Sequence, residues 1–460
     1  MTVEQIYTGC LAQGAYYIES NGEAAIIDPL RETKPYMDRA GRDGATIKYI
    51  FETHFHADFV SGHLTLSQIT GAPIVYGPNA DPSFEAIIAK DSQEFKIGAV
   101  TLVALHTPGH TMESTTYLLK DAEGKDYCIF SGDTLFLGDV GRPDLAQKSA
   151  SMTQEDLAGI LYDSLRTKIM PLSDEVIVYP AHGAGSACGK NMMKETVDTL
   201  GNQKLVNYAL RENMNKTEFI KEVTDGLLPP PAYFPLNVKM NKEGYDALDQ
   251  VVNRGTVKIS AEDFETLANN SGAIILDVRH QEDFIKGHIP RSIFIGLDGS
   301  FAPWVGTLIA DTEQPILLIV PENREEEAVT RLSRVGFDKT LGYLDGGIQA
   351  WYEAGKEVDT LSSTPVNVFK QQLNENTPVF DVRKEGEFGA SHIPNAIHTP
   401  LGSLNNYLDV FPKNEMCYIH CAGGYRSVIA ASILKSRGIH NIVDVAGGFD
   451  AIIEAGIATT

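Results

Sequence analysis

Short apolar runs recur along the first half of the chain, and each leads into a loop that carries histidine or aspartate. Six examples are residues 23–28 (EAAIID), 47–53 (IKYIFET), 72–77 (APIVYG), 100–107 (VTLVALHT), 127–136 (YCIFSGDTLF) and 175–182 (EVIVYPAH). Their short length and their β-branched and aromatic content predict buried strands. Polar groups held at the ends of buried strands are a common way to build a binding site. Residues 1–225 are therefore predicted to form a sheet-based domain with its functional groups in loops.

A second pattern occurs twice in the C-terminal part. Residues 275–293 (ILDVRHQEDFIKGHIPRSI) return as residues 379–397 (VFDVRKEGEFGASHIPNAI). In each copy, short β-branched runs alternate with helix-like segments, which favours βαβ units and a parallel sheet. Residues 258–358 and 364–460 are therefore predicted to be two α/β domains of one kind.

Residues 226–257 lie between these parts and contain the stretch LLPPPAYFPL. Three consecutive prolines favour an extended, semi-rigid linker, so we place the domain boundary there. A chain of 460 residues allows roughly two to four domains. The prediction is thus a multidomain α/β protein with one N-terminal domain, a linker and a repeated C-terminal domain.

Composition and net charge indicate in which compartment the protein is expected and which partners are not. No apolar run reaches the roughly 18 residues that a membrane span needs, and the start MTVEQIYTGC does not resemble a signal peptide. The five cysteines are odd in number and scattered, which favours reduced thiols in a cytoplasm. The net charge of −23 repels nucleic acid and anionic membranes, so neither is an expected partner.

Potential metal ligands follow several of the predicted strands. They are His54, His56 and Asp58 in THFHADFVSGH, His110 in HTPGHT, Asp133 in SGDT and His182 in YPAHG. A lone histidine is usually structural, and we expect that role for His63 and His106. The recurrence of such residues after apolar runs favours a metal site.

This set resembles the metallo-β-lactamase superfamily, an αββα sandwich of two sheets between helices. In its dinuclear members, the first metal takes the first two histidines of the loop and the one corresponding to His110. The second metal takes the loop aspartate, the last loop histidine and the histidine corresponding to His182, while the residue corresponding to Asp133 bridges the two. Here Phe59 stands in place of the last loop histidine, so the second metal loses a ligand.

The resemblance then implies a single metal with open coordination positions. Its ligands would be His54, His110 and Asp133. Two histidines and one carboxylate are typical of mononuclear iron(II) that activates O2, so we expect one Fe(II) per chain. Three further residues would orient these ligands from behind, namely His56, Asp58 and His182.

Within the superfamily, the N-terminal part looks most like the persulfide dioxygenases, which oxidise the outer sulfur of a thiol persulfide to sulfite. The segment GDTLFLGDVGRPDL at residues 132–145 carries this resemblance. It implies that Arg142 helps to hold the carrier thiol, because a guanidinium can donate two parallel hydrogen bonds to a carboxylate or phosphate. Glutathione-using members tend to have Asp-Tyr after the last histidine, whereas this chain has Gly183 and Ala184, so the carrier stays open.

Both repeated domains resemble rhodanese, the sulfurtransferase fold. In the second copy, residues 418–431 (YIHCAGGYRSVIAA) predict a strand that ends at Cys421, followed by a loop and a helix. Gly423 and Gly424 let backbone N–H groups face the sulfur, and the helix N-terminus adds positive potential; both favour the nucleophilic thiolate. Arg426 adds charge that can attract an anionic sulfur substrate.

The first copy has no nucleophile at this place. In its stretch LLIVPENREEEAV, Pro321 is aligned with Cys421, the loop is predicted to be two residues shorter, and Glu325 to Glu327 make it acidic. We interpret this copy as a scaffold. Structural roles are expected for Asp277 with Arg279, Asp381 with Arg383, His288 and His392.

Together these features predict an enzyme that oxidises a thiol persulfide with O2 to sulfite and thiol. Transfer of sulfane sulfur through Cys421 would then give thiosulfate, although the direction of that step and a homo-oligomeric state stay open. One alternative is a zinc-dependent thioester hydrolase of the glyoxalase II type, which usually needs two metals and is disfavoured by Phe59. The other is a non-catalytic persulfide carrier or sensor, which the full ligand set disfavours.

Overall fold

The computed structural model describes residues 1–460, apart from the side chains of residues 148 and 149. It divides into two compact units. Unit 1 comprises Met1–Leu248 and Ser333–Gly336, and unit 2 comprises Asp249–Leu332 and Phe337–Thr460. Within the described part of the chain, no helix is long and apolar enough to cross a membrane.

Unit 1 contains two six-stranded sheets. The first has, in spatial order, β1 (Thr2–Thr8), β2 (Gln13–Ser20), β3 (Glu23–Ile27), β4 (Thr46–Phe51), β5 (Ile74–Tyr76) and β6 (Ile87–Ile88). The second has β12 (Asp198–Thr199), β11 (Ile177–Pro180), β10 (Asp126–Gly132), β9 (Thr115–Lys120), β8 (Val100–His106) and β7 (Glu94–Ile97). The helices and turns of this unit are α1 (Lys34–Asp43), α2 (His63–Thr70), α3 (Gln147–Ala150), α4 (Gln154–Ser164), η1 (Leu165–Ile169), α5 (Leu200–Val206), η2 (Tyr208–Leu210) and α6 (Lys216–Thr224).

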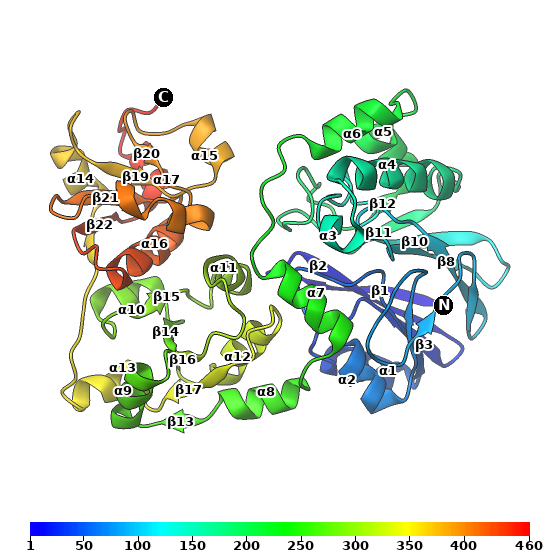
Figure 1. Ribbon diagram of the computed structural model, residues 1–460, viewed down its shortest axis with the longest axis horizontal. Helices are drawn as coiled ribbons and strands as arrows, with labels where there is room; N and C mark the ends of the chain where they lie inside the picture. Colours follow the sequence, from blue (N-terminus) through cyan, green and yellow to red (C-terminus); the bar gives the residue numbers. More distant parts are fainter. The chain divides into compact units, whose positions relative to one another are not determined.

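The alternating faces of β2 show how these layers arise. Tyr16 and Ile18 face the apolar core between the two sheets, whereas Ala15 and Tyr17 face a core that the first sheet shares with α1 and α2. Successive side chains of a strand point to opposite faces, and here both faces are buried, so the strand is apolar throughout. A third core joins the second sheet to α4, α5 and α6. Figure 1 shows these helices on one side of the two sheets and α1 and α2 on the other, which confirms the predicted αββα sandwich.

The segment predicted as an extended linker is largely helical. Residues 226–257 contain α7 (Phe234–Glu243) and α8 (Leu248–Gly255). Pro235 lies in the first turn of α7, where a proline is tolerated because the first N–H groups have no partner within the helix. Val238 packs against an apolar cluster around Phe55 of the metal-loop region. The prolines therefore restrict only the short stretch before α7, and α7 itself belongs to unit 1.

Unit 2 contains two five-stranded sheets in which every strand pair is parallel. The first has the order β13 (Lys258–Ile259), β17 (Thr340–Leu344), β16 (Ile316–Ile319), β14 (Ile274–Asp277) and β15 (Ile293–Phe294). The second has β18 (Ser362–Thr364), β22 (Ile442–Val445), β21 (Cys417–His420), β19 (Val379–Asp381) and β20 (Ile397–His398). The two orders correspond strand for strand, which confirms that the repeated sequence forms one α/β fold twice.

The connecting helices of unit 2 also come in two sets. The first copy has α9 (Ala261–Asn270), α10 (Gln281–Lys286), α11 (Phe301–Leu308), α12 (Glu325–Ser333) and α13 (Gly347–Glu353). The second has α14 (Val366–Gln372), α15 (Glu385–Ala390), η3 (Leu401–Asn406), η4 (Leu408–Val410), α16 (Tyr425–Ser436) and α17 (Gly448–Glu454).

Candidate metal centre and cysteine loop

The ends of neighbouring strands bring the predicted metal ligands of unit 1 together. Strands β10 and β11 pair in parallel with Gly132 beside Pro180, so the residues that follow, Asp133 and His182, lie at the same edge of the sheet. Gly132 has a φ of 55°, and a Cβ there would lie 2.7 Å from the side chain of Thr53, so the close approach of the two loops requires glycine.

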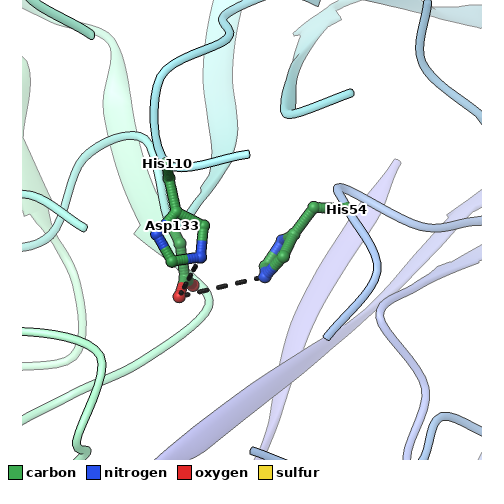
Figure 2. Close-up of side chains that lie close together, drawn as sticks. All are labelled: His54, His110 and Asp133. Carbon is green, nitrogen blue, oxygen red and sulfur yellow. Dashed lines mark ion pairs between the residues drawn. The ribbon is translucent and has the colours of Figure 1, made fainter. Parts of the chain in front are cut away.

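His54, His110 and Asp133 face one another across the gap between the two sheets' loops, as Figure 2 shows. Nε2 of His110 lies 3.4 Å from Oδ2 of Asp133, and Nε2 of His54 lies 3.9 Å from the same oxygen. These distances are too long for hydrogen bonds. Two ligands bound to one metal at about 2.1 Å are themselves roughly 3–3.5 Å apart, so the spacing is close to that of a shared metal ion.

Buried polar atoms without hydrogen-bond partners indicate whether a metal ion fits between the candidate ligands. Five buried atoms of the site have no hydrogen-bond partner among the described residues. They are both carboxylate oxygens of Asp133, both ring nitrogens of His182 and Oδ1 of Asp58. Each such atom costs roughly 1–3 kcal/mol if it stays unsatisfied. A cation bound between these groups would satisfy several of them at once, so the residues fit a metal.

Hydrogen bonds behind the ligands fix their orientation. Nδ1 of His110 lies 2.8 Å from the carbonyl of Arg142, which can only accept, so this nitrogen carries the proton and Nε2 keeps its lone pair. The hydroxyl of Thr53 donates to Asp28 at 2.9 Å and accepts from Nδ1 of His54 at 3.0 Å. Metal-binding histidines are commonly held in this way through their second nitrogen.

His56 is turned toward two buried carboxylates. Its Nε2 lies 3.1 Å from Asp28 and 3.3 Å from Glu52. Burial alone would lower the pKa of His56, but Asp28 and Glu52 raise it well above its usual value. The ring of Phe59 stacks on His56 with the ring centroids 4.3 Å apart, and this side chain is fully buried.

Asp58 and His182 form a second group beside the first. Nε2 of His182 lies 3.5 Å from Asp58 and 3.6 Å from Asp133. With His56, their potential ligand atoms all lie within 4.8 Å of one another. Phe59 offers no ligand atom here, so this group has one ligand fewer than the resemblance would expect for a second metal.

Two further residues at this site were not predicted from the sequence. Asn241 of α7 donates to the carbonyls of His56 and Phe59, both at 2.8 Å, and accepts from the N–H of Ser61 at 2.8 Å. Cys188 is buried and lies in a potential ligand group with Asp133 and His182. Cys188 follows His182 in one loop, which is a signal that the sequence offers, whereas nothing near Asn241 points to the metal loop.

The predicted role of Arg142 does not fit its surroundings. Its guanidinium donates to both oxygens of Asp144, at 2.7 and 2.8 Å, and to the carbonyls of Ala187 and Leu228. The side chain is 5% exposed. Its donors are therefore occupied by the protein, and Arg142 holds loops of unit 1 together while its own carbonyl orients His110.

The two histidines expected to be structural have different surroundings, and of the two His106 has a hydrogen-bond partner. His63 begins α2, and its Nδ1 lies 3.4 Å from Glu52. Nε2 of His106 lies 2.9 Å from the carbonyl of Met112. Neither belongs to a potential metal-ligand group among the described residues.

The cysteine loop of unit 2 holds one sulfur in a buried position. Cys421 is 1% exposed, and its Sγ accepts from the N–H of Gly424 at 3.1 Å. Gly424 has a φ of 97°, a conformation that favours glycine, whereas Gly423 has open space around it. The hydroxyl of Ser427 lies 3.5 Å from the same sulfur.

Arg426 is not free to attract a substrate as predicted. Its two terminal nitrogens bind the two oxygens of Glu387 at 2.7 and 2.8 Å. The hydrogen bonds from Arg426 hold the pKa of Glu387 at about 2, so the pair stays charged and mutually neutralised. Glu387 lies 39 residues away in the sequence, so the residues around Arg426 give no sign of this pair.

The sheet register also corrects the alignment of the two copies. Asp277 pairs with Ile319 in the first copy and Asp381 with His420 in the second. Val320, and not Pro321, therefore corresponds to Cys421. The loop before the helix spans residues 321–324 in the first copy and 422–424 in the second, so it is one residue longer in the first copy, not two shorter.

The structure gives the other repeated residues local partners. Arg279 binds Asp277 and Arg383 binds Asp381, each at 2.6 Å. Nδ1 of His288 and of His392 each lies 2.9 Å from the backbone carbonyl four residues earlier.

Comparison with known proteins divides the chain in the same way. Residues 8–182 match the model of the metallo-beta-lactamase superfamily, and residues 260–354 and 366–455 match the rhodanese-like domain. A solved structure described as a metallo-beta-lactamase from Staphylococcus aureus subsp. aureus COL is 31% identical, with a TM-score of 0.65, and the match covers 74% of this chain and 98% of that one.

Two curated relatives differ in their chemistry. The persulfide dioxygenase ETHE1, mitochondrial, of Homo sapiens is 29% identical over 225 residues, which are 48% of this chain and 78% of that protein. The cytoplasmic hydroxyacylglutathione hydrolase of Arabidopsis thaliana is 30% identical over 178 residues, 38% of this chain and 65% of the hydrolase. The chain thus spans slightly less than two thirds of that hydrolase.

Proposed function

We propose that this chain, which belongs to the metallo-β-lactamase superfamily and carries two rhodanese-like domains, is a sulfur-metabolising enzyme that oxidises a thiol persulfide and transfers sulfane sulfur. One observation carries this proposal. The site joins two histidines and one carboxylate, and Phe59, which stacks on His56, stands where the family resemblance expects a histidine ligand of a second metal.

Iron is the metal that this donor set supports best. His54, His110 and Asp133 would hold the metal with two imidazoles and one carboxylate, the donor set of mononuclear iron(II) sites. Iron(II) bound there would supply the one-electron chemistry that lets O2 react with sulfur. The chain keeps the ligands oriented through Thr53 and the Arg142 carbonyl, and their burial keeps bulk water out.

The oxidation balances with water as a co-reactant. One persulfide R–S–SH, one O2 and one water give one thiol R–SH, one sulfite and two protons. The outer sulfur loses four electrons, which reduce O2, and the S–S bond breaks. The relative named persulfide dioxygenase supports this reaction class.

The cysteine loop supports a transfer step. The Cys421 thiolate attacks the outer sulfur of a persulfide, the old S–S bond breaks, and the thiol leaves with a proton. Sulfite then attacks the outer sulfur of the cysteine persulfide, releasing thiosulfate and the thiolate. The N–H of Gly424 holds the Cys421 sulfur in both steps. The same loop can run this exchange in reverse.

A cytoplasm is the proposed location, since all five cysteines are free thiols in the structure and a reducing compartment keeps them so. The proposed partners are a low-molecular-weight thiol persulfide, O2, sulfite and thiosulfate. The carrier thiol is left open, because the sequence departs from glutathione-using members after His182 and Arg142 binds Asp144.

Metal analysis with oxygen uptake tests the proposal. Protein made in iron-supplemented medium should hold one iron per chain and consume O2 when a thiol persulfide is added. His110→Ala should lose the iron and the oxygen uptake, whereas His106→Ala, a matched histidine outside the ligand group, should keep both. Active protein with two bound zinc ions would contradict the proposal.

A zinc-dependent thioester hydrolase is the second candidate, and one observation favours it. His56, Asp58 and His182 lie close together beside the first ligand group, and the hydroxyacylglutathione hydrolase is a relative. Such an enzyme would hydrolyse a glutathione thioester without O2 and would hold two zinc ions. A non-catalytic persulfide carrier, the third candidate, would show neither oxygen uptake nor thioester hydrolysis.

A further inference from the structure

A buried carboxyl lies on the sheet beneath the cysteine loop of the second rhodanese-like copy. Asp444 belongs to β22 and is 2% exposed. It pairs with Ile419 of β21, two residues before Cys421. Its neighbours Val443 and Val445 pack into the core that this sheet shares with α14 and α17. Because side chains alternate between the faces of a strand, Asp444 points to the opposite face, on the side of Ile419 and Cys421.

Ser427 of α16 lies between the sulfur and this carboxyl. Helix α16 packs against both β21 and β22. The hydroxyl of Ser427 lies 3.5 Å from Sγ of Cys421 and donates to the carbonyl of Gly424 at 3.3 Å. It is also close enough to Asp444 to lower the pKa of that carboxyl through a hydrogen bond. A hydroxyl has one proton and two lone pairs and can turn, so Ser427 can accept from the thiol while it donates to the carboxylate.

Asp444 has an acceptor atom left for this bond. Its Oδ2 accepts from the hydroxyl of Ser363 at 3.1 Å, whereas its Oδ1 is buried and has no hydrogen-bond partner among the described residues. Burial raises the pKa of Asp444 to about 6, and hydrogen bonds from Ser427 and Ser363 oppose this rise. Near neutral pH the carboxylate is therefore ionised but readily protonated, which suits a proton acceptor.

The other ionisable groups around the sulfur are poor proton acceptors. Arg426 lies near Cys421 and binds Glu387 of α15 at 2.7 and 2.8 Å. The hydrogen bonds from Arg426 hold the pKa of Glu387 at about 2. His420 stacks on the far side of the sheet, and burial lowers its pKa. Since Sγ is 1% exposed and meets little water, Asp444 is the group that fits as acceptor of the thiol proton.

The copy without the cysteine has none of the three groups at the corresponding places. It has Val320 for Cys421, Glu325 to Glu327 in the first helical turn that contains Ser427, and Tyr343 for Asp444. The two copies nevertheless keep the same strand order and the same aspartate–arginine pairs. The fold thus does not require the serine and the carboxyl, which occur together with the thiol.

We infer that Ser427 and Asp444 form a proton relay for Cys421, in which Ser427 contacts the reacting sulfur. As Cys421 attacks the outer sulfur of a persulfide, its S–H proton passes to the oxygen of Ser427, and the proton of that hydroxyl passes to Oδ1 of Asp444. The old S–S bond breaks, and the leaving thiolate takes a proton from water. When sulfite later releases the Cys421 thiolate, the proton returns along the same path. This inference rests on the proposed sulfur transfer and adds the groups that carry its proton.

The two half-reactions of sulfur transfer from thiosulfate to cyanide test the relay. In the full-length protein, Ser427→Ala and Asp444→Asn should each lower kcat/KM for thiosulfate at least tenfold at pH 7, because the thiol loses its base. The kcat/KM for cyanide should stay close to the wild-type value, since attack on the cysteine persulfide releases a thiolate and needs no base. The double variant should fall no further than the single variants, because both residues act on one proton.

The pH profile distinguishes a relay from a structural role. In the wild type, kcat/KM for thiosulfate should rise with pH through about 6, as Asp444 becomes ionised. In Asp444→Asn this rise should be absent, and the rate should increase only at higher pH, where the thiol loses its proton to water. The variant should also have a higher Tm than the wild type at pH 8, because no buried carboxyl has to ionise. A lower rate in a more stable protein excludes misfolding as its cause.

Matched substitutions serve as controls. Ser436→Ala on α16 and the exposed Asp409→Asn should keep both values of kcat/KM. Asp444→Leu is the second variant if the asparagine does not fold, and it should show the same loss. The inference is wrong if Ser427→Ala and Asp444→Asn keep the wild-type rate and pH profile, or if their losses add or affect both half-reactions equally. If the wild type transfers no sulfur, or Cys421→Ser transfers it equally fast, the proposed function itself fails.

Discussion

The two rhodanese-like domains share a framework down to single hydrogen bonds, and they differ at one loop. In each copy the N–H after the strand-end aspartate donates to the corresponding residue of the next strand, from Val278 to Ile319 and from Val382 to His420. One residue further along, the first copy has Val320 and the second has Cys421. The two copies thus keep the same sheet and ion pairs, and the sulfur transfer that we propose for the second copy depends on a few residues after one strand.

The surroundings of that position differ in charge as well. In the second copy the sulfur meets the N–H of Gly424. In the first copy Arg324 binds Glu327 and Asp298, each at 2.7 Å, and Glu325, Glu326 and Glu327 form the first turn of α12. Acidic residues in a first turn stabilise the helix but repel anionic sulfur compounds. The charge around this position in the first copy therefore disfavours the sulfur transfer that we propose for the second.

Contacts between the copies support a scaffold role for the first. The hydroxyl of Tyr425, the first residue of α16, donates to the carbonyl of Gly296 at 2.8 Å. The N–H of Phe294 donates to the hydroxyl of Ser432 on the same helix at 3.0 Å. The first copy therefore contacts the helix that follows the cysteine loop, and we propose that it holds this helix in place.

Removal of the Cys421 thiol should have the largest effect on the rate of sulfur transfer. Cys421→Ser should lower sulfur transfer from thiosulfate to cyanide at least a hundredfold, because a serine hydroxyl cannot form the persulfide. Cys10→Ser, a cysteine of unit 1, is the control and should keep the rate. A Cys421→Ser protein that transfers sulfur at nearly the wild-type rate would show that the two copies are not divided as proposed.

Cys421→Ser should also separate oxygen uptake from sulfur transfer. Oxygen uptake by Cys421→Ser should persist, because none of the ligand groups of unit 1 includes a residue of the cysteine loop. Its product should be mainly sulfite instead of thiosulfate. The assay must be short enough to exclude spontaneous reaction of sulfite with persulfide.

Introducing a cysteine into the first copy tests whether the thiol alone distinguishes the two copies. Val320→Cys in the Cys421→Ser background gives the first copy a thiol at the corresponding position, yet transfer to cyanide should stay about a hundredfold or more below the wild type. The acidic first turn of α12 disfavours a thiolate there. Alkylation of the introduced thiol by iodoacetamide should accordingly be slow. A restored transfer rate would mean that the cysteine alone, without its loop, defines the active copy.

The main layers and the repeat could be predicted because they are encoded locally. Alternating apolar positions predict strands such as β2, and the duplicated segments fold into matching sheets. The grouping of His54, His110 and Asp133 followed from their positions after strands and from the family resemblance. Parallel pairing of β10 with β11 explains why residues far apart in the sequence meet at one edge.

Partners brought in from distant segments could not be predicted. Asn241 is 185 residues from His56, and nothing in the sequence of α7 indicates that it holds the metal loop. The role expected of Arg426 rests on its charge and that of Arg142 on the family resemblance, but the two guanidinium groups bind Glu387 and Asp144. The sequence alone aligns Pro321 with Cys421, whereas the pairing between strands makes Val320 the corresponding residue.

A buried carboxyl gives the second copy a pH dependence that the first lacks. Asp444 pairs with Ile419 in β21, and Tyr343 pairs with Leu318 at the corresponding place in the first copy. Burial raises the pKa of Asp444 from 3.8 to about 6. Between these pH values the folded state binds more protons than the unfolded state, so stability falls as the pH rises through this window.

Replacement of this carboxyl should therefore stabilise the second copy above about pH 6. The cost of ionising Asp444 approaches roughly 3 kcal/mol there. Asp444→Asn should raise the Tm of the unit 2 transition at pH 8 and change it little at pH 4. The exposed Asp450→Asn is the matched control and should leave Tm unchanged at both pH values. An equal change at both pH values would show that the effect comes from lost hydrogen bonds, such as that from Ser363.

The smallest effect is expected from the glycines of the cysteine loop, and it separates two neighbours that the sequence treats alike. Gly424 has a φ of 97° and donates its N–H to Cys421, so Gly424→Ala forces an unfavourable backbone conformation that costs about 1–2 kcal/mol. Either the loop stays strained or the N–H turns away from the sulfur, so sulfur transfer should fall several-fold and the Tm of unit 2 should drop.

Gly423 has no positive φ and nothing within 4 Å of an added Cβ, so Gly423→Ala should change stability by no more than about 0.5 kcal/mol. Thermal unfolding and the cyanide assay on both variants measure the difference, and equal losses for the two would show that the N–H of Gly424 has no special part in holding the sulfur.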